Sequence, residues 1–455
     1  MNRTKIICTI GPADESVEIL KQMILEGMDV ARFNLSHGTH ESHLAYINNV
    51  RSASEQLNIP ISIMLDTKGP EIRVGDFDGG QAQLIKGQKF VLTTQKVLGN
   101  NSCVYVNYEN LPAEVKKGTV ILLNDGNVEL QVVSCTKTDI TTKVVAGGKL
   151  TNKKSVNLPN IDINMPYISD QDKADIKFAC DVDADYLAIS FVNRAENVLA
   201  VRKLVAKYGK PNMKIISKIE SSSGVENAHE ILEVSDGIVI ARGDLGVEVD
   251  FEKIPLIQKA LIAECNEHGK ISITATQMLE SMGVNNRPTR AEISDVANSV
   301  CDGTTAVMLT GETSAGNHPA LVVKTMARII EEMDMSAEGN DFAYIKPENM
   351  SFAGNMGYGV CALEYAFGES AVVCINDYEL TKSISNFRPA TTIYAFTNNK
   401  KESNLETLLY GVVPIYTKGT LNVENCINYL VKNKMVKKSM PIIIASKDMI
   451  NVIKQ

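Results

Sequence analysis

Short apolar runs rich in β-branched residues alternate along most of the chain with stretches of helical periodicity. Strands are predicted at residues 4–10, 29–35, 61–65, 186–191, 214–219, 237–241, 271–275 and 306–309. Amphipathic helices are predicted between them at residues 16–26, 40–56, 170–179, 195–207, 252–267 and 291–300. This alternation is typical of a parallel α/β sheet, and closure into a (β/α)8 TIM barrel is the simplest arrangement.

The alternation is interrupted once and later resumes. Between residues 70 and 166 the strand-like runs 81–85, 89–94, 119–123, 128–134 and 140–145 are separated by glycine turns, with no convincing helix. We therefore expect a small β-barrel lid domain (70–166) inserted into the barrel domain (1–69 and 167–336). Strands at 371–375, 391–396, 412–416 and 441–445 exceed what an eight-stranded barrel can hold, which predicts a separate C-terminal α/β domain at residues 337–455.

Composition narrows the class of protein. The 455-residue chain is 44% hydrophobic and carries a net charge of -8, so nucleic acid is not expected as a partner. Its nine cysteines are scattered without a C-x-x-C pair, which favours reduced thiols over disulfides or zinc. No apolar stretch approaches the roughly 20 residues of a membrane span, and the opening MNRTKIICTIGP is not typical of a signal peptide. We expect a cytoplasmic protein with no membrane partner.

Polar side chains gather where the predicted barrel strands end. Each alone suits a solvated loop or a helix cap, but the carboxyl ends of parallel strands meet at one rim, where ligands bind. The side chains concerned are Arg32, Asn34, Ser36, Asp66, Thr67, Lys218, Glu220, Asp244 and Thr276.

This set of side chains suits phosphoryl transfer. Glu220 and Asp244 are oxygen ligands of the kind that Mg²⁺ prefers, Lys218 adds a fixed positive charge, and Arg32 can bind an anion through two hydrogen bonds. The neutral and anionic oxygens at positions 34, 36, 66 and 67 suit a monovalent cation. The chain has no G-x-x-x-x-G-K-[ST] segment, so a nucleotide would not use a P-loop.

Eight segments in one order resemble the pyruvate kinase family. They are KIICTIGP, ARFNLSHGTH, LDTKGPEIR, KSVNLP, IISKIE, DGIVIARGDLGVE, ATQMLESM and RPTRAEISDVANSVCDGTTAVMLTGET. The resemblance runs from residue 4 to about residue 320 and continues more weakly through the C-terminal domain. The absence of a leader before KIICTIGP is similar to bacterial members.

The resemblance implies a phosphotransferase that moves the phosphoryl group of phosphoenolpyruvate to ADP, giving ATP and pyruvate. It implies the cofactors Mg²⁺ (or Mn²⁺) and K⁺, a mobile lid, a C-terminal domain that often binds an effector, and a homotetramer. The resemblance also implies roles for the site residues. The catalytic residues are Arg32, Lys218 and Thr276, and these hold the substrate together with Gly243 and Asp244. The implied Mg²⁺ ligands are Glu220 and Asp244, and the implied K⁺ ligands are Asn34, Ser36, Asp66 and Thr67. The implied nucleotide contacts are Asn34, Leu35, Ser36, His37, Arg73 and Lys154.

Several alternatives stay open at this point. Lys154 can be a solvated charge, His37 a loop-orienting residue, and Arg73 the partner of a lid carboxylate. A glutamate at position 71 resembles the K⁺-requiring members. Residues 376–379 (NDYE) replace the Ser/Thr-rich loop where family members bind a sugar phosphate, so the allosteric effector stays open, as does the proton donor. A Mg²⁺-dependent pyruvate-enolate lyase and a catalytically silent relative are the alternative functions.

Overall fold

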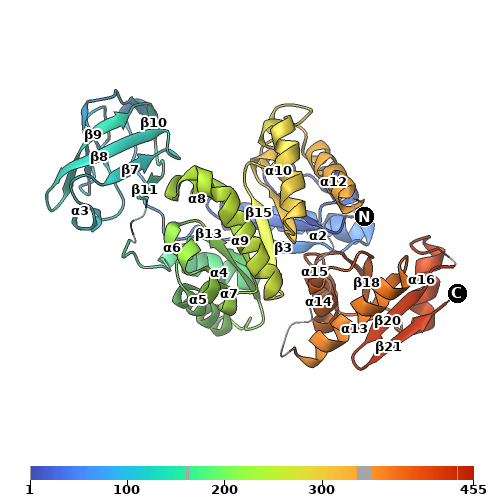
Figure 1. Cartoon of the computed structure of the whole chain (residues 1–455). Helices are drawn as coiled ribbons and strands as arrows, with labels where there is room; N and C mark the ends of the chain where they lie inside the picture. The colour runs from blue at the N-terminus through green and yellow to red at the C-terminus, as the bar shows by residue number, and fades with distance from the viewer. Residues whose placement is uncertain (1, 160, 162, 336–349, 438, 455) are drawn as a thin grey trace.

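The computed structural model describes residues 2–159, 161, 163–335, 350–437 and 439–454. Figure 1 shows three bodies in a row: the lid at one end, the barrel in the middle and the C-terminal domain at the other end. The α/β barrel with an inserted lid and a C-terminal α/β domain is confirmed. The predicted boundary between residues 336 and 337 lies outside the described residues.

Eight parallel strands close the barrel in the order β1-β16-β15-β14-β13-β12-β3-β2. They are β1 Lys5–Thr9, β2 Val30–Asn34, β3 Ser62–Asp66, β12 Tyr186–Ile189, β13 Lys214–Ile219, β14 Gly237–Ala241, β15 Ile271–Ala275 and β16 Ala306–Leu309. All eight were predicted from apolar runs. Such runs arise because a barrel strand is buried on both faces, against the interior and against the surrounding helices.

The outer layer contains the predicted helices and several that were missed. Its helices are α1 Val17–Leu25, α2 His40–Leu57, α4 Asp170–Asp181, α5 Ala195–Lys207, α6 Ser222–Glu226, α7 Ala228–Val234, α8 Arg242–Glu248, α9 Ile254–Glu267, α10 Arg290–Cys301, α11 Gly311–Ser314 and α12 Pro319–Met335, with short 3₁₀ turns at Phe251–Lys253 and Glu280–Gly283. Capping boxes begin α2 at Thr39 and α10 at Thr289, where each threonine oxygen accepts from a backbone N–H of the first turn.

The lid is a six-stranded sheet, β11-β7-β8-β9-β5-β6, beside a two-stranded sheet, β10-β4. Its elements are a 3₁₀ turn Asp78–Gly80, β4 Gln81–Gln83, β5 Lys89–Thr93, β6 Cys103–Tyr105, α3 Leu111–Glu114, β7 Val120–Leu123, β8 Val128–Cys135, β9 Asp139–Ala146, β10 Lys149–Thr151 and β11 Val156–Asn157. The expectation of a lid without a helix is wrong at α3, which is too short to show a period. The lid has a hydrophobic core of its own around Phe90, Leu130 and Val144.

The C-terminal domain is a five-stranded sheet in the order β19-β18-β17-β20-β21. Its elements are α13 Phe352–Phe367, β17 Ala371–Ile375, α14 Tyr378–Asn386, β18 Ile393–Thr397, α15 Lys400–Glu406, β19 Val412–Tyr416, α16 Val423–Lys432, β20 Ile442–Ser446 and β21 Met449–Ile453. β21 was not predicted; it pairs antiparallel with β20 at the sheet edge and is mostly half-exposed, so it lacks a long apolar run.

The C-terminal domain closes the floor of the barrel. Leu408, fully buried, packs into the barrel interior with Tyr186 and Met64, and the Tyr186 hydroxyl donates to the carbonyl of Leu405 at 2.7 Å. Lys401, at the start of α15, forms an ion pair with buried Asp185 at 2.8 Å. The open end of the barrel is therefore its opposite, carboxyl rim.

Candidate active site

The rim residues predicted from the sequence follow different strands, and several of them meet in the structure. Arg32 and Asn34 lie in β2, Asp66 ends β3 with Thr67 next, and Lys218 lies in β13 with Glu220 just after it. Asp244 lies in the first turn of α8 after β14, and Thr276 follows β15. Because the strands are parallel and closed into a barrel, all these ends face the same side.

Asp66 lies at the centre of a buried ion network. Its Oδ2 accepts from Arg32 Nε at 2.8 Å and lies 2.6 Å from Arg32 Nη2, while its Oδ1 lies 3.4 Å from Lys218 Nζ. Burial alone would raise the pKa of Asp66, but Lys218 and Arg32 bring that pKa below its ordinary value. The carboxylate is therefore ionised and holds both cations at the rim.

Lys218 is aimed at the carboxylates of the site. Its Nζ lies 2.9 Å from Glu220 Oε1 and donates to Ser190 Oγ at 2.8 Å. Burial would lower the pKa of this amine, but Asp66 and Glu220 raise it above its usual range. Lys218 therefore stays protonated and supplies a fixed positive charge in a water-poor place.

Glu220 and Asp244 are two carboxylates that are attracted by the same cation, Lys218. Glu220 is 1% exposed, and its Oε2 accepts from the Phe191 backbone N–H at 2.6 Å. Burial raises the pKa of Glu220 to about 7, against the attraction of Lys218 and with added repulsion from Asp244. Burial likewise raises the pKa of Asp244. A divalent cation would stabilise the ionised form of both groups.

These two oxygen donors fit Mg²⁺ in chemical type. Among the described residues no cluster of three or more His, Cys, Asp or Glu side chains could hold a metal. A Mg²⁺ ion commonly takes one or two carboxylates and completes its shell with water and substrate phosphate. The pair therefore fits a metal that is shared with the substrate better than a closed structural site.

Thr276 lies in a strained turn at the rim and is hydrogen bonded to Gly243. Gly243 N–H donates to Thr276 Oγ1 at 2.7 Å, and Thr276 and the next residue, Gln277, have φ of 69° and 53°. Arg242 holds this turn by donating to the Thr276 carbonyl at 2.6 Å, and Asp295 anchors Arg242 at 2.6 Å. Positive φ in a threonine is costly and concentrates at functional sites.

The residues assigned to nucleotide in β2 and its loop lie close together. Asn34 Oδ1 accepts from the Ser36 N–H at 3.1 Å, and the backbone carbonyl of exposed His37 accepts from His43 Nε2 at 2.7 Å. Leu35 turns its half-buried side chain onto the barrel core. The side chain of Leu35 therefore packs inward and does not point to the loop surface.

The lid residues Arg73 and Lys154 lie apart from this rim network. Arg73 Nε and Nη2 donate to the two carboxylate oxygens of Glu71 at 2.9 Å each, and Arg73 Nη1 donates to the Lys153 carbonyl at 2.8 Å. Within the described ranges no hydrogen bond or ion pair links Arg73 or Lys154 to the rim network. The pairing of Arg73 with a lid carboxylate, one of the sequence alternatives, is present.

Sequence reasoning missed Ser190 and Arg242. Ser190 is 3% exposed, and its hydroxyl accepts from Lys218 and donates to the Thr67 carbonyl at 2.8 Å. A signal was available, because Ser190 directly follows β12 just as Glu220 directly follows β13. Arg242 directly follows β14, but its partner Asp295 is too distant in sequence to be inferred.

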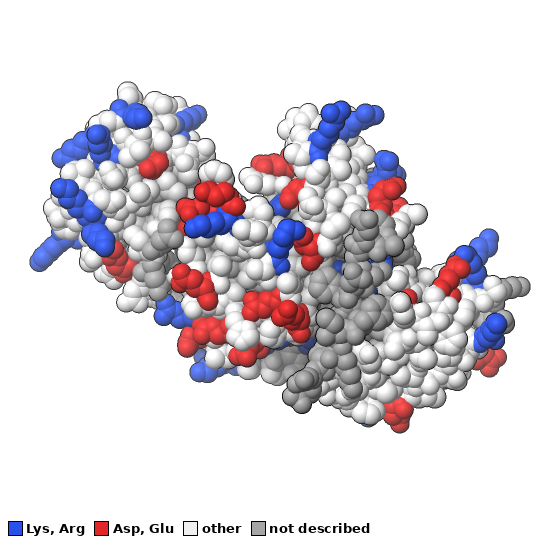
Figure 2. All heavy atoms as spheres, in the orientation of Figure 1, with Lys and Arg blue, Asp and Glu red and all other residues white. Residues whose placement is uncertain are grey.

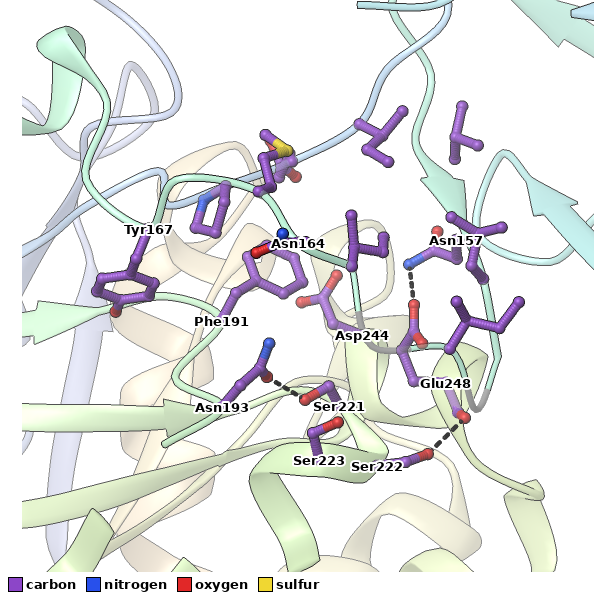
Figure 3. Close-up of a pocket in the computed structure, with 18 of the residues that line it drawn as sticks. Asn157, Asn164, Tyr167, Phe191, Asn193, Ser221, Ser222, Ser223, Asp244 and Glu248 are labelled. Atoms are coloured by element: carbon purple, nitrogen blue, oxygen red, sulfur yellow. Dashed lines mark hydrogen bonds between the residues drawn. The ribbon is translucent and has the colours of Figure 1, made fainter. Parts of the chain in front are cut away.

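Beside the rim, a cavity of about 390 Å³ separates the lid from the barrel (Figure 3). Its walls include both chain crossings into the lid, near Pro70 and near Tyr167, and the rim side chain Asp244. In Figure 3 Asp244, Asn193 and Ser221–Ser223 rise from the barrel, and Asn157 descends from the lid. The lid therefore faces Asp244 across this cavity.

The surface adds two observations. On the face drawn in Figure 2, basic side chains are scattered over the lid, and acidic and basic ones are mixed over the barrel. The described part of this face therefore shows no continuous basic band for nucleic acid. No helix among the described residues has the length and apolar character needed to cross a membrane.

A TIM barrel with a buried lysine, an arginine and two carboxylates at its carboxyl rim is an arrangement that suits an enzyme acting on an anionic substrate. Comparison with known proteins identifies the family within this class. The family models "Pyruvate kinase, barrel domain" and "Pyruvate kinase, alpha/beta domain" match residues 1–323 and 370–454. The chain belongs to the pyruvate kinase family.

Individual relatives agree with this assignment. A pyruvate kinase of Staphylococcus haemolyticus is 42% identical over 433 residues, covering 94% of this chain and 74% of the relative. One of Bacillus licheniformis is 44% identical over 417 residues, 90% and 71% of the two chains. A crystal structure of a pyruvate kinase from Cryptosporidium parvum superposes with a TM-score of 0.93 at 34% identity, covering 100% of this chain and 96% of that one.

Proposed function

We infer that this chain is a pyruvate kinase, a phosphotransferase that moves the phosphoryl group of phosphoenolpyruvate to ADP. The P–O bond of the enol phosphate breaks, a P–O bond to a terminal ADP oxygen forms, and the enolate takes a proton to give pyruvate. The observation that carries the assignment is the buried network of Lys218, Glu220, Asp66 and Arg32, found within a chain of this family.

In this proposal the rim residues divide the work by charge. Arg32 binds the transferring phosphate, and Lys218 stabilises the charge that develops as the phosphoryl group passes between oxygens. Gly243, Asp244 and Thr276 hold the substrate carboxylate. Glu220 and Asp244 would hold Mg²⁺ or Mn²⁺, which supplies positive charge to the phosphate oxygens.

The remaining assignments concern the potassium ion and the nucleotide. The carboxylate of Asp66 and the oxygens of Asn34, Ser36 and Thr67 are the proposed K⁺ ligands. The nucleotide is proposed to contact the loop of residues 34–37 together with Arg73 and Lys154 of the lid. Because Arg73 and Lys154 are lid residues, closing the lid would complete the nucleotide site.

The organisation proposed for the whole protein follows the family. The proposed domains are 1–69 with 167–336, 70–166 and 337–455, assembled as a cytoplasmic homotetramer. Support for the lid limits comes from the cavity at both crossings, which is where a hinge would open.

An assay that couples pyruvate formation to NADH oxidation tests the function. Purified protein with phosphoenolpyruvate, ADP and Mg²⁺ should form pyruvate and ATP, with strong activation by K⁺. Pyruvate formed without ATP would show that the phosphoryl group passes to water and not to ADP. No turnover with or without K⁺ would favour a silent relative or a lyase, because a lyase cleaves a carbon–carbon bond that phosphoenolpyruvate does not offer.

A further inference from the structure

Glu248 connects the lid to the barrel at the wall of the cavity. Its Oε1 accepts a hydrogen bond from Asn157 Nδ2 at 2.9 Å (Figure 3). The backbone of Leu158 also hydrogen bonds to this carboxylate. Asn157 ends β11, the last strand of the lid before the chain returns to the barrel. The carboxylate of Glu248 therefore holds the returning segment of the lid at two adjacent residues.

Glu248 shares helix α8 with one proposed Mg²⁺ ligand, Asp244, and contacts the segment that follows the other, Glu220. Glu248 is the last residue of α8 and stands one helical turn after Asp244, so both side chains lie on the same side of the helix and line the cavity. Its carbonyl accepts from Ser222 Oγ at 3.1 Å, and Ser222 follows Glu220 by two residues. The contact thus spans the lid, α8 and the start of α6.

The short length of helix α8 allows a movement at its last residue to reach its first turn. α8 has only seven residues, Arg242–Glu248, and its buried Leu245 anchors it on the barrel between the two ends. A displacement of Asn157 is passed through its hydrogen bond to Glu248 at the end of α8. Because α8 is short, the displacement also moves its first turn, which holds Gly243 and Asp244. Hydrogen bonds to a half-buried carboxylate are charge-assisted, and water does not replace them without loss.

We propose that Glu248 is a positioning residue that couples the position of the lid to helix α8 and, through it, to Asp244. The inference rests on the proposed function, because the lid matters to turnover through its nucleotide contacts. Glu248 itself touches neither nucleotide nor metal. It lets lid movement and the placement of a metal ligand occur together.

Two variants test the coupling. Glu248→Ala removes the acceptor, and Asn157→Asp places a second carboxylate against the first. Each should raise the KM for ADP and weaken Mg²⁺ binding, by about tenfold for a lost charge-assisted hydrogen bond, with a smaller effect on kcat. Hydrogen exchange should quicken in two peptides at once, one covering residues 149–158 of the lid and one covering residues 242–248.

A swapped pair separates positioning from simple loss of structure. In the double variant Asn157→Asp with Glu248→Gln, donor and acceptor exchange places, so the hydrogen bond can re-form with the opposite direction. This variant should recover a KM for ADP within about threefold of the parent, together with slow exchange in both peptides. Asn100→Ala is the matched control, since Asn100 accepts from Ser102 and Cys103 within the lid and lies outside the cavity lining.

The outcomes decide the proposal. Unchanged KM for ADP and unchanged exchange in Glu248→Ala would overturn it, and so would a swapped pair that stays as impaired as the single variants. Equal effects in Asn100→Ala would also count against it. Failure of the proposed function looks different: the parent would then form no ATP, while the exchange experiment would still report whether lid and helix are coupled.

Discussion

Lys218 shows how a single side chain is prepared by its neighbours. It lies between Glu220 and Asp66 with Ser190 as a third partner, and its protonated form is favoured although it is buried. Lys218→Met keeps most of the volume and removes the charge. We expect turnover to fall by several orders of magnitude, about 3–5 kcal/mol of transition-state stabilisation.

The measurement is steady-state turnover, with circular dichroism and Mg²⁺ titration as controls for fold and metal binding. Turnover in Lys218→Met above roughly a tenth of the parent value would contradict the role, because that loss is only about 1.4 kcal/mol.

Glu220 gives a prediction about pH. Its pKa is raised to about 7 by burial, so without metal it is largely protonated at mildly acid pH. Because Mg²⁺ competes with this proton, Mg²⁺ affinity should rise as pH increases up to about 7 and then level off. Titration calorimetry in Glu220→Gln should show weaker Mg²⁺ binding that no longer follows this rise.

Asp244→Asn should also bind Mg²⁺ more weakly. Titration curves of either variant that superpose on the curve of the parent would refute the metal assignment.

Glu71 bears on the potassium requirement. It pairs with Arg73 through both oxygens, so the pair carries no net charge and does not supply the additional positive charge that the substrate needs. We expect strong activation by K⁺, little by Na⁺, and partial relief of the requirement in Glu71→Lys. Assays in an organic-cation buffer at constant ionic strength measure this. Full activity there without K⁺ would refute the ion site.

At the scale of elements, the barrel was predictable because its strands are apolar on both faces and end in polar residues. The rim chemistry followed from which residues stand at those ends, as with Lys218 and Glu220. β21 was missed because an edge strand is half-exposed, and the partnership of Arg242 with Asp295 was missed because a contact between α8 and α10 leaves no local sequence signal. The closed or open state of the lid likewise depends on packing between domains, which residue spacing does not encode.

Helix α15 carries a buried acid at the joint between the C-terminal domain and the barrel. Glu406 is 1% exposed, and burial, with repulsion from Glu402, raises its pKa to about 8. Its raised pKa means that ionisation disfavours the folded state, so this group costs stability as pH rises between its ordinary pKa of 4.5 and about 8. The Glu406→Gln variant has no ionisable group at this position, so it does not lose this stability as pH rises.

The free energy of unfolding of Glu406→Gln, minus that of the parent, should therefore increase across this interval, by an amount on the order of a few kcal/mol. Denaturant unfolding at a series of pH values measures it. A difference that stays constant with pH would show that Glu406 titrates normally. Glu402→Gln removes only the repulsion that Glu402 exerts on Glu406, so it should show a smaller trend of the same sign.

At the scale of the whole molecule, the loop at residues 376–379 bears on regulation. Asp377 caps α14 by accepting from the Leu380 N–H at 3.0 Å, and Glu379 is exposed beside it. The nearby cations Arg202 and Lys214 are already paired with Asp236. We expect no activation by fructose 1,6-bisphosphate, because Asp377 and Glu379 place two carboxylates in this loop and carboxylates repel a phosphate. Calorimetric binding tighter than about 100 μM, roughly 5.5 kcal/mol, would contradict this.

The floor of the barrel bears on how modular the protein is. Leu408 belongs to the C-terminal half of the chain yet completes the interior of the barrel beside Tyr186 and Met64. A barrel expressed without it would expose an apolar hole, so the two domains should behave as one cooperative unit, unlike the lid with its separate core. In a chimaera that exchanges C-terminal domains between relatives, the segment around Leu408 must therefore match the interior of the recipient barrel in shape and volume.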